Sequence, residues 1–310
     1  MDELNIAIAT SGLTRDLKEG RADTGGLQLN HIEITPITQA MRRMVRGLEF
    51  DVCEMAITTY LCARAHGKPV TAIPVFVTRN FHHGAIFRAA GSDIRDPKDL
   101  EGRTVGVNRG YTVTTGIWAR GILRAEYGVD LESITWAATD DEHVAEFAAP
   151  ANVDYSNQGT SIADLLAGGK VGAGVGAFPA GAADIERLIS DPLAAGAAYY
   201  AKTGVYPINH TIVVKDAVLE ANPEIARTLF QAFKSSKSAY LARLDAKTDL
   251  EPADEINVAL SKIVGDPFPF GVAANRKALE TVVDFAHDQG VISERPGVDG
   301  LFATGTSDLT

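Results

Sequence analysis

Cysteine and basic residues are scarce in this sequence. Among its 310 residues there are two cysteines, Cys53 and Cys62, which are too few for a disulfide scaffold and lack a metal-ligand pattern. We expect both to be small core residues in a reducing compartment. Lysine and arginine number 29 against 40 acidic residues, and the net charge of −11 argues against nucleic acid or an anionic membrane as partner. An anionic ligand therefore needs a local cationic pocket.

Long hydrophobic runs are also absent. No run approaches the roughly 18 apolar residues that span a bilayer. The first residues have neither the basic segment nor the long apolar segment of a secretory leader. We therefore expect a cytoplasmic protein. The composition, 45% hydrophobic and 22% charged, is that of a globular chain.

Strand-like and helix-like segments alternate along the chain, which favours an α/β fold. A strand at 205–214 is expected to return to the first sheet. The pattern predicts these other elements: strands at 4–9, 50–52, 104–107, 134–137 and 171–177, a β-rich passage at 70–90 broken by Pro74, and helices after Thr35-Pro36, after Ser161, from Asn222 and from Asn275 to Gly290.

Residues 102–116 are the most informative segment. A strand at 104–107 is followed by a turn at Gly110 and by a threonine-rich start of a helix that runs to Tyr127. Free backbone N–H groups and the positive helix end point at the same spot there. Arg109 adds a fork of donors that suits a carboxylate. The segment predicts an anion pocket for a small acid.

The order of elements resembles the type II periplasmic-binding-protein fold. The segments that carry this resemblance are 97–107, which enters the second lobe, and 206–214, which returns to the first. It implies two α/β lobes joined by a hinge of two crossing segments, with the ligand in the cleft between them. Lobe 1 is then 1–92 plus 208–310, and lobe 2 is 93–207.

A set of shorter segments narrows the family. Together they resemble the 4,5-dihydroxyphthalate decarboxylases, cytoplasmic aromatic-acid decarboxylases on the binding-protein scaffold, and the resemblance runs from Ile6 to Phe302. The segments are 50–56, 79–83, 107–116, 141–144 and 206–210. The resemblance implies a lyase of phthalate degradation, which converts 4,5-dihydroxyphthalate, or a close dihydroxylated aromatic diacid, to protocatechuate without oxidation.

This chemistry sets three requirements for the site. The ring carbon that bears the carboxylate is protonated, a para hydroxyl supplies electron density, and CO2 leaves. The site then needs cationic clamps for the carboxylates, a general acid, and an acceptor for the hydroxyls. Arg15, Arg79 and Arg109 are the candidate clamps.

His83 is the first candidate for the proton donor, because histidine titrates near neutral pH and a neighbouring carboxylate would keep it protonated. His82 should point to the opposite face of a regular strand. His143 is a second candidate, either as the acid or as a partner of a catechol oxygen. Glu54 is the third catalytic candidate, since it can accept a catechol proton or orient a histidine; its alternative role is a helix N-terminal acid.

Further substrate-binding candidates are Tyr111, Thr112 and Thr114, which can donate to a carboxylate or phenolate or can cap a helix. His210, where the chain is expected to cross back to the first lobe, is a further substrate-binding candidate. For each of these residues, the sequence leaves a purely structural role open as the alternative to substrate binding.

No cofactor is expected, because the reaction needs no electron sink. The glycines at 172–174 are followed neither by an acidic residue at the right distance nor by an uninterrupted helix, so they do not indicate a dinucleotide site. No HxH or HExxH spacing occurs, and a divalent metal holding the catechol is kept as a minor alternative. The expected partner is a small aromatic dicarboxylate, with no nucleic acid and no membrane; a homo-oligomer stays open.

Two other functions compete with the lyase. One is a solute-binding protein that delivers an aromatic or sulfonated acid to an ABC transporter. The missing leader and the histidines in ligand-facing segments disfavour it, because a pure binder needs no proton relay. The other is a cytoplasmic enzyme of the same scaffold that acts on another substrate, as in menaquinone or thiamine-precursor synthesis.

Overall fold

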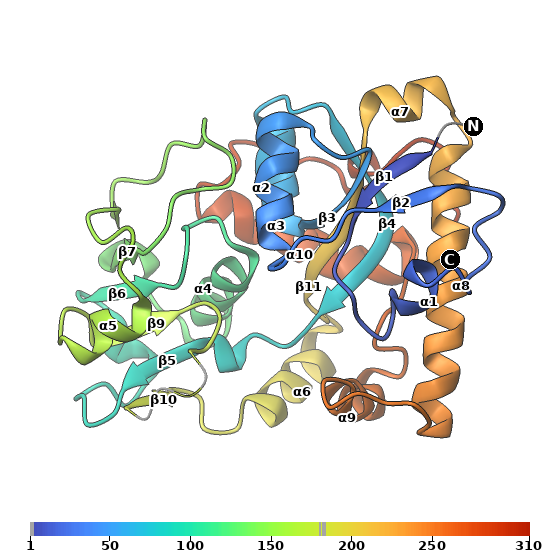
Figure 1. Ribbon diagram of the computed structural model, residues 1–310. Helices are drawn as coiled ribbons and strands as arrows, with labels where there is room; N and C mark the ends of the chain where they lie inside the picture. Colours follow the sequence, from blue (N-terminus) through green and yellow to red (C-terminus); the bar gives the residue numbers. More distant parts are fainter. Residues whose placement is uncertain (1–2, 180, 182–183) are drawn as a thin grey trace. The chain divides into compact units, whose positions relative to one another are not determined.

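The chain folds into two compact units. The computed structural model describes residues 3–179, 181 and 184–310 (Figure 1). Unit 1 comprises the residues up to Arg79, Ile208–Glu280 and Pro296–Thr310. Unit 2 comprises Asn80–Pro207 and Thr281–Arg295.

Unit 1 is built on a five-stranded sheet in the order β2-β1-β3-β11-β4. The strands β2, β1 and β3 are parallel, and β11 runs antiparallel to both β3 and β4. This confirms the predicted return of the chain to its first sheet. The strands are β1 (Leu4–Ala7), β2 (Leu29–His31), β3 (Val52–Ala56), β4 (Val70–Arg79) and β11 (Ile208–Lys215).

Helices cover both faces of this sheet. Figure 1 shows α2 and α3 on one side and α8 on the other. The main core joins Ile6, Val52 and Ile212 of the strands to Phe230 and Phe233 of α8. The helices are α1 (Arg15–Lys18), α2 (Thr38–Gly47), α3 (Ile57–Ala65), α7 (Asp216–Ala221), α8 (Ile225–Ala246), α9 (Asp254–Val264), α10 (Val272–Asp288) and the 3-10 helix η4 (Val298–Leu301).

Unit 2 has a six-stranded sheet in the order β10-β5-β9-β6-β7-β8. The strands β9, β6, β7 and β8 are parallel, whereas β5 is antiparallel to β9 and β10 is antiparallel to β5. The strands are β5 (Ile86–Ala89), β6 (Thr104–Val107), β7 (Thr135–Ala138), β8 (Val153–Asp154), β9 (Ala173–Val175) and β10 (Ile185–Arg187).

The helices of unit 2 pack on the two faces of its sheet. Val105 and Val107 belong to the same core as Leu123 of α4, and a Cβ on the intervening Gly106 would lie 2.2 Å from Ile162 of α5. Because strand side chains alternate, α4 and α5 lie on opposite faces. The helices are α4 (Thr114–Tyr127), α5 (Ile162–Ala167), α6 (Pro192–Thr203) and the 3-10 helices η1 (His83–Ala85), η2 (Pro97–Leu100) and η3 (Leu131–Ser133).

The unit boundaries differ from the predicted lobes at two places. Residues 80–92, assigned to lobe 1 from sequence, lie in unit 2 because β5 pairs with β9 and β10. Residues 281–295 also lie in unit 2, where Phe285 packs edge-on against Trp118. The chain returns to unit 1 between Pro207 and Ile208, the position at which lobe 2 was predicted to end.

Two strand predictions also need correction. Pro74 does not break the β-rich passage, because β4 runs continuously from Val70 to Arg79 and absorbs the proline where its pairing with β11 shifts register. The strand expected at 50–52 begins at Val52 and continues to Ala56. Among the described residues, no helix has the length and apolar character needed to cross a membrane.

Candidate functional site

A buried carboxylate and a histidine form a pair on the central strands of unit 1. Glu54 of β3 lies opposite Ile212 of β11, and His210 lies two residues before Ile212. The two side chains are therefore diagonal neighbours on one face of the sheet. The Nδ1 atom of His210 is 2.6 Å from Oε1 of Glu54, although the residues are 156 positions apart in sequence.

Glu54 also receives hydrogen bonds from two neighbouring segments. Its Oε2 atom accepts the backbone N–H of Ala9 at 2.9 Å, and the hydroxyl of Thr78 lies 3.5 Å from Oε1. Burial alone raises the pKa of Glu54, but the hydrogen bond and charge of His210, together with Ala9 and Thr78, hold that pKa below its ordinary value of 4.5. The carboxylate is ionised at neutral pH and fixes the imidazole ring.

His210 is the more exposed member of this pair. Its side chain is 19% exposed, against 2% for Glu54. Its second ring nitrogen, Nε2, makes no hydrogen bond to any residue that the structure describes. A ring fixed by a buried carboxylate through one nitrogen, with the other nitrogen free, is suited to give or take a proton. The contact with His210 is the one that an orienting role of Glu54 requires, and its role toward a substrate stays a prediction.

His83 forms a second histidine–carboxylate pair, in unit 2. Its Nε2 atom is 2.6 Å from Oε2 of Glu126, and its ring is fully buried. Its Nδ1 atom is buried without a hydrogen-bond partner among the described residues. The ring also packs edge-on against Tyr199, with ring centroids 5.7 Å apart. His83 therefore has the expected carboxylate neighbour but no solvent-facing nitrogen.

His83 also lies far from the predicted anion pocket. Glu126 is in the last turn of α4, about 18 Å along the axis from Thr114 at its start, since an α-helix rises about 1.5 Å per residue. His82 contacts the other half of this helix: its ring stacks on Trp118 with centroids 6.3 Å apart. An aromatic diacid is too short to touch both His83 and the start of α4.

The predicted anion pocket holds a carboxylate of the chain itself. Oε1 of Glu142 accepts the backbone N–H of Tyr111 at 2.5 Å and the hydroxyl of Tyr155 at 2.6 Å. Oε2 accepts the backbone N–H and the hydroxyl of Thr112, at 3.0 and 2.5 Å. The backbone N–H groups and the Thr112 hydroxyl, which we expected to bind a ligand, are therefore bonded to Glu142, and so is Tyr155, which was not a predicted site residue. Sequence reasoning named Glu142 only as part of segment 141–144 and missed its contact with the turn.

Two other expectations for the segment are changed by its hydrogen bonds. The Tyr111 hydroxyl donates to the backbone carbonyl of Gln289 at 3.2 Å. Val113, rather than a threonine, is the N-cap residue of α4, and it makes no side-chain capping bond. Thr114 is the first helical residue and is 2% exposed. The roles of Tyr111, Thr112 and Thr114 toward a substrate stay predictions.

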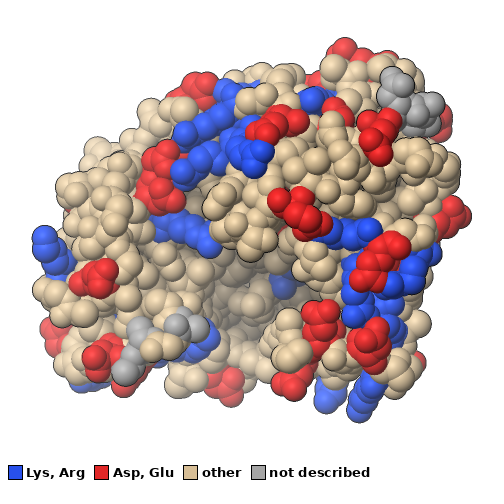
Figure 2. Space-filling model, viewed as in Figure 1, with Lys and Arg blue, Asp and Glu red and all other residues tan. Residues whose placement is uncertain are grey.

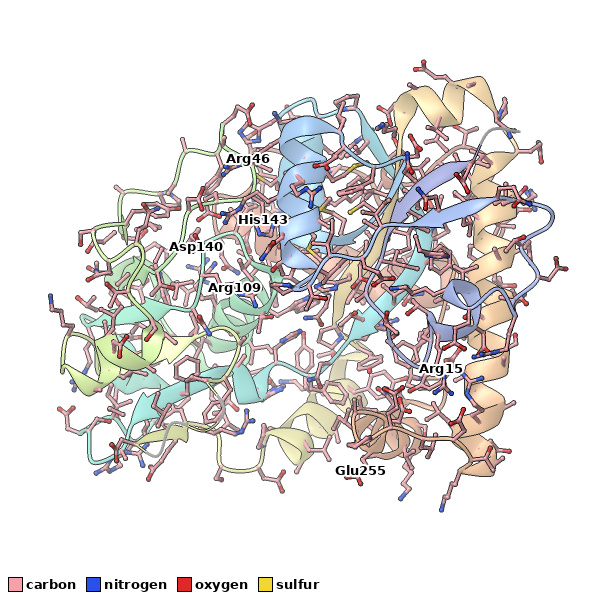
Figure 3. The ribbon with its side chains drawn as sticks, viewed as in Figure 1. Arg15, Arg46, Arg109, Asp140, His143 and Glu255 are labelled. Atoms are coloured by element: carbon pink, nitrogen blue, oxygen red, sulfur yellow. The ribbon has the colours of Figure 1, made fainter. Side chains whose placement is uncertain are left out.

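Arg109 is the predicted clamp that keeps its guanidinium available. Its backbone has φ +81°, a conformation that is strained for a residue with a side chain. Thr139, just after β7, holds it there: the Thr139 hydroxyl accepts the Arg109 N–H at 2.8 Å, and the Thr139 N–H donates to the Arg109 carbonyl at 3.1 Å. Figure 3 labels the Arg109 side chain. The residue is half-buried, and its guanidinium makes no hydrogen bond or ion pair with a described residue.

The other predicted arginines are engaged within unit 1. Arg15, at the start of α1, forms ion pairs with Asp249 and, at 3.5 Å, with Glu251. Arg79 is buried at the end of β4 and donates to the side chain of Asn275 in α10.

His143 is 7% exposed and follows β7 in unit 2, on the same loop as Glu142.

Among the predicted site residues, the structure brings Glu54 to His210 and places Arg109 beside Tyr111 and Thr112.

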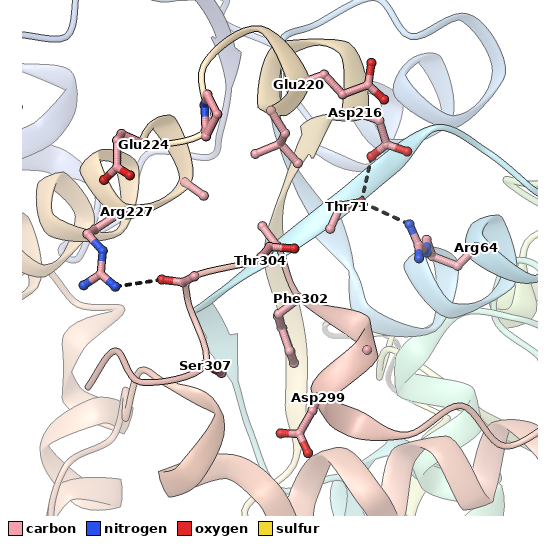
Figure 4. Close-up of a pocket in the computed structure, with 16 residues that line it drawn as sticks. Arg64, Thr71, Asp216, Glu220, Glu224, Arg227, Asp299, Phe302, Thr304 and Ser307 are labelled. Carbon is pink, nitrogen blue, oxygen red and sulfur yellow. Dashed lines mark hydrogen bonds between the residues drawn. The ribbon is translucent and has the colours of Figure 1, made fainter.

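A hollow of about 870 Å³ on unit 1 is a different feature (Figure 4). Arg64 and Arg227 line it, but Arg64 donates to Thr71 at 3.0 Å and Arg227 to the carbonyl of Gly305 at 2.9 Å. The described residues that line this hollow include none of the predicted site residues and no histidine. It therefore offers no imidazole as a proton donor.

The described residues include no group of three or more His, Cys, Asp or Glu placed to hold a metal ion. Charged groups of both signs are interspersed on the face seen in Figure 2, where lysine and arginine lie beside acidic side chains.

Comparison with known proteins gives matches over most of the chain. Residues 25–243 match the sequence profile of a family described as NMT1/THI5 like. A 4,5-dihydroxyphthalate decarboxylase of Comamonas testosteroni is 28% identical over 311 residues, covering 94% of this chain and 94% of the relative. Another 4,5-dihydroxyphthalate decarboxylase, of Pseudomonas putida, is 26% identical over 215 residues, covering 64% and 83%.

The fold is also found among solved structures. The periplasmic aliphatic sulphonate binding protein of Escherichia coli superposes with a TM-score of 0.61 at 15% identity, over 99% of each chain. At this identity the likeness concerns the fold alone. It confirms the predicted type II periplasmic-binding-protein-like α/β fold with two sheets.

Proposed function

The chain belongs to the NMT1/THI5-like family, and from that premise we propose that it is a carboxy-lyase. Its substrate is 4,5-dihydroxyphthalate or a close dihydroxylated aromatic diacid, and its product from the former is protocatechuate. Similarity along nearly the whole length of a 28% identical decarboxylase supports the reaction type. The single observation that carries the proposal is the Glu54–His210 pair, with Nδ1 of the ring 2.6 Å from a buried carboxylate.

His210 supplies the proton in this mechanism. Its imidazolium donates a proton to the ring carbon that bears the departing carboxylate, and a new C–H bond forms. The hydroxyl para to that carbon, once ionised, supplies the electron pair. The bond from the ring to the carboxylate then breaks, CO2 leaves, and its electron pair restores the aromatic ring. Solvent returns a proton to His210.

Glu54 keeps His210 ready for this step. Because its pKa is lowered, Glu54 stays ionised and stabilises the positively charged ring. The hydrogen bond at Nδ1 also leaves Nε2 as the nitrogen that faces the substrate. This is the carboxylate–histidine arrangement of general acid–base catalysis. Glu54 therefore acts through His210 and is a positioning residue.

Arg109 is assigned to a substrate carboxylate. Its guanidinium has no partner among the described residues, and its strained backbone is held by Thr139. A planar fork of N–H donors matches a carboxylate in geometry and charge. We assign no further role to Arg15 and Arg79, since each already binds groups of unit 1.

The test is turnover by the purified protein. It is incubated with 4,5-dihydroxyphthalate, without added cofactor, while the ultraviolet spectrum and released CO2 are followed. Formation of protocatechuate with an equal amount of CO2 is expected. Phthalate, which lacks the para hydroxyl, should bind without reacting because the electron supply is missing. Tight saturable binding of 4,5-dihydroxyphthalate without turnover would instead indicate a solute-binding protein.

A further inference from the structure

We propose that Glu142 is a positioning residue, whose carboxylate is a built-in anion that fixes the turn presenting Arg109 to the substrate. The inference rests on the proposed function in one respect, the assignment of Arg109 to a substrate carboxylate. Glu142 itself is bound by its own chain and does not touch the reacting atoms. Its loop follows β7, whereas the turn it holds follows the adjacent strand β6.

The turn that leads into α4 binds Glu142 through several donors. Its two oxygens accept the backbone N–H groups of Tyr111 and Thr112 and the hydroxyls of Thr112 and Tyr155. Glu142 is 8% exposed, so these bonds are largely shielded from water. Burial, followed by the charge and hydrogen bond of Glu142, raises the pKa of Tyr155, which therefore remains a hydroxyl donor. A carboxylate in such a nest is held in one orientation.

Arg120 binds Tyr111 from the other side. Arg120 is fully buried, and its guanidinium lies 3.9 Å from the centroid of the Tyr111 ring. It donates to the Tyr111 carbonyl at 2.6 Å and to the Gln289 side chain at 2.7 Å. Glu142 thus binds the N–H of Tyr111 while Arg120 binds its carbonyl. Both peptide groups that flank Tyr111 are fixed before any ligand binds.

The missing side chain at Gly110 leaves room for the Glu142 carboxylate. A Cβ atom on Gly110 would lie 2.8 Å from Oε2 of Glu142, so a side chain at that position would displace the carboxylate. Glycine at 110 therefore allows the carboxylate to approach the turn. Its neighbour Arg109 is held at φ +81° by Thr139. Thr139 and Glu142 together set the backbone on both sides of Gly110, which pre-orients the Arg109 guanidinium.

The test compares Glu142→Ala and Glu142→Gln with wild type. The probe is phthalate, and its Kd is measured by calorimetry. Without the carboxylate the turn loosens, and we expect the Kd for phthalate and the KM to rise roughly tenfold or more while kcat changes less than about threefold. Glu142→Gln keeps size and shape but brings an NH2 group toward N–H donors, so it should show the same direction. If the alanine variant does not fold, the glutamine variant decides the question.

Formate provides a rescue that a merely structural role would not produce. It is small enough to enter the nest that Glu142→Ala vacates, and it should lower the Kd for phthalate of this variant toward the wild-type value. Formate should not improve wild type or Arg109→Ala. Wild-type affinity for phthalate in both Glu142 variants, or loss of affinity that formate leaves unchanged, overturns the proposal.

A separate readout distinguishes this inference from the proposed reaction. Exchange of the Tyr111 and Thr112 amide hydrogens should be slow in wild type, faster in Glu142→Ala, and slow again with formate. This pattern does not require turnover. If wild type fails to decarboxylate but phthalate binding still depends on Arg109 and Glu142 as described, the reaction is wrong and the positioning role stands. Equal exchange in wild type and Glu142→Ala overturns the role.

Discussion

Each unit contains a histidine–carboxylate pair, and the two pairs are opposite in burial. In both, a ring nitrogen lies 2.6 Å from a carboxylate oxygen. In unit 1 the carboxylate of Glu54 is 2% exposed and His210 is 19% exposed, whereas in unit 2 His83 is fully buried and Glu126 is 19% exposed. The same interaction therefore has different uses. A buried carboxylate can orient an accessible ring, whereas His83, the buried member of its pair, has no solvent-facing nitrogen.

The pairs also differ in their surroundings. Glu54 accepts hydrogen bonds from Ala9, just after β1, and from Thr78, near the end of β4, in addition to its contact with His210. His83 instead packs against Tyr199. Burial of Tyr199, followed by the charge of Glu126, raises the pKa of Tyr199 to about 12. The unit 2 pair thus fastens η1 to α4 and lies near α6. We infer that it contributes to stability rather than to chemistry.

The largest effect should come from His210. His210→Gln keeps a polar side chain but removes the titrating ring, and kcat should fall by roughly 10²-fold or more, as expected for loss of a general acid. The Kd for phthalate should change little, because binding does not require the proton. Initial rates at saturating substrate measure the first quantity and calorimetry the second. A kcat close to wild type would remove His210 from the role of donor.

Glu54→Gln should have the next largest effect. The neutral amide no longer stabilises the charged ring and can hold it in the wrong tautomer, so kcat should fall by roughly 10- to 10³-fold. The pH–rate profile should also change shape, because the ionised carboxylate of Glu54 no longer faces the ring. A stability loss with an unchanged pH–rate profile would reduce Glu54 to a packing residue.

Acid unfolding tests the same pair without a substrate. The pKa of Glu54 is lower in the folded state than its ordinary value of 4.5, so its stabilising contribution is complete above about pH 4.5. That contribution is lost as pH falls below 4.5 through the lowered pKa. The free energy of unfolding of wild type should therefore decline more steeply in this range than that of Glu54→Gln. Parallel curves from denaturant titrations would show that the pKa is not lowered.

The smallest effect on catalysis should come from His83→Gln, the matched change in unit 2. The ring is buried and bound to Glu126, so kcat should stay within about threefold of wild type while stability falls by about 1–3 kcal/mol. Thermal unfolding and initial rates measure the two quantities. The assignment of His83 as the proton donor, made from sequence, predicts instead a loss of about 10²-fold in kcat. The comparison with His210→Gln decides between the two histidines.

Much of the fold could be predicted from local patterns. The strand at 104–107, the helix ending at Tyr127 and the capping by Ser161 depend on neighbours within a few residues, and the structure confirms them. The boundary of unit 2 could not be predicted in this way. Residues 86–89 have the composition of a strand, but the choice of sheet depends on β9 and β10, which come about 85 to 100 residues later.

The candidate site, like the fold, could be predicted from the sequence only in part. The sequence alone determined which residue types were available: Arg109 beside a glycine turn, Glu54 after an apolar segment, and histidines in several predicted loops. Tertiary structure decided their partners, because a β11 register that sets Glu54 opposite Ile212 makes His210 its neighbour. It also placed Glu142 on the N–H groups expected to bind a ligand. Side-chain chemistry is encoded residue by residue, whereas distance and burial arise only when remote strands pair.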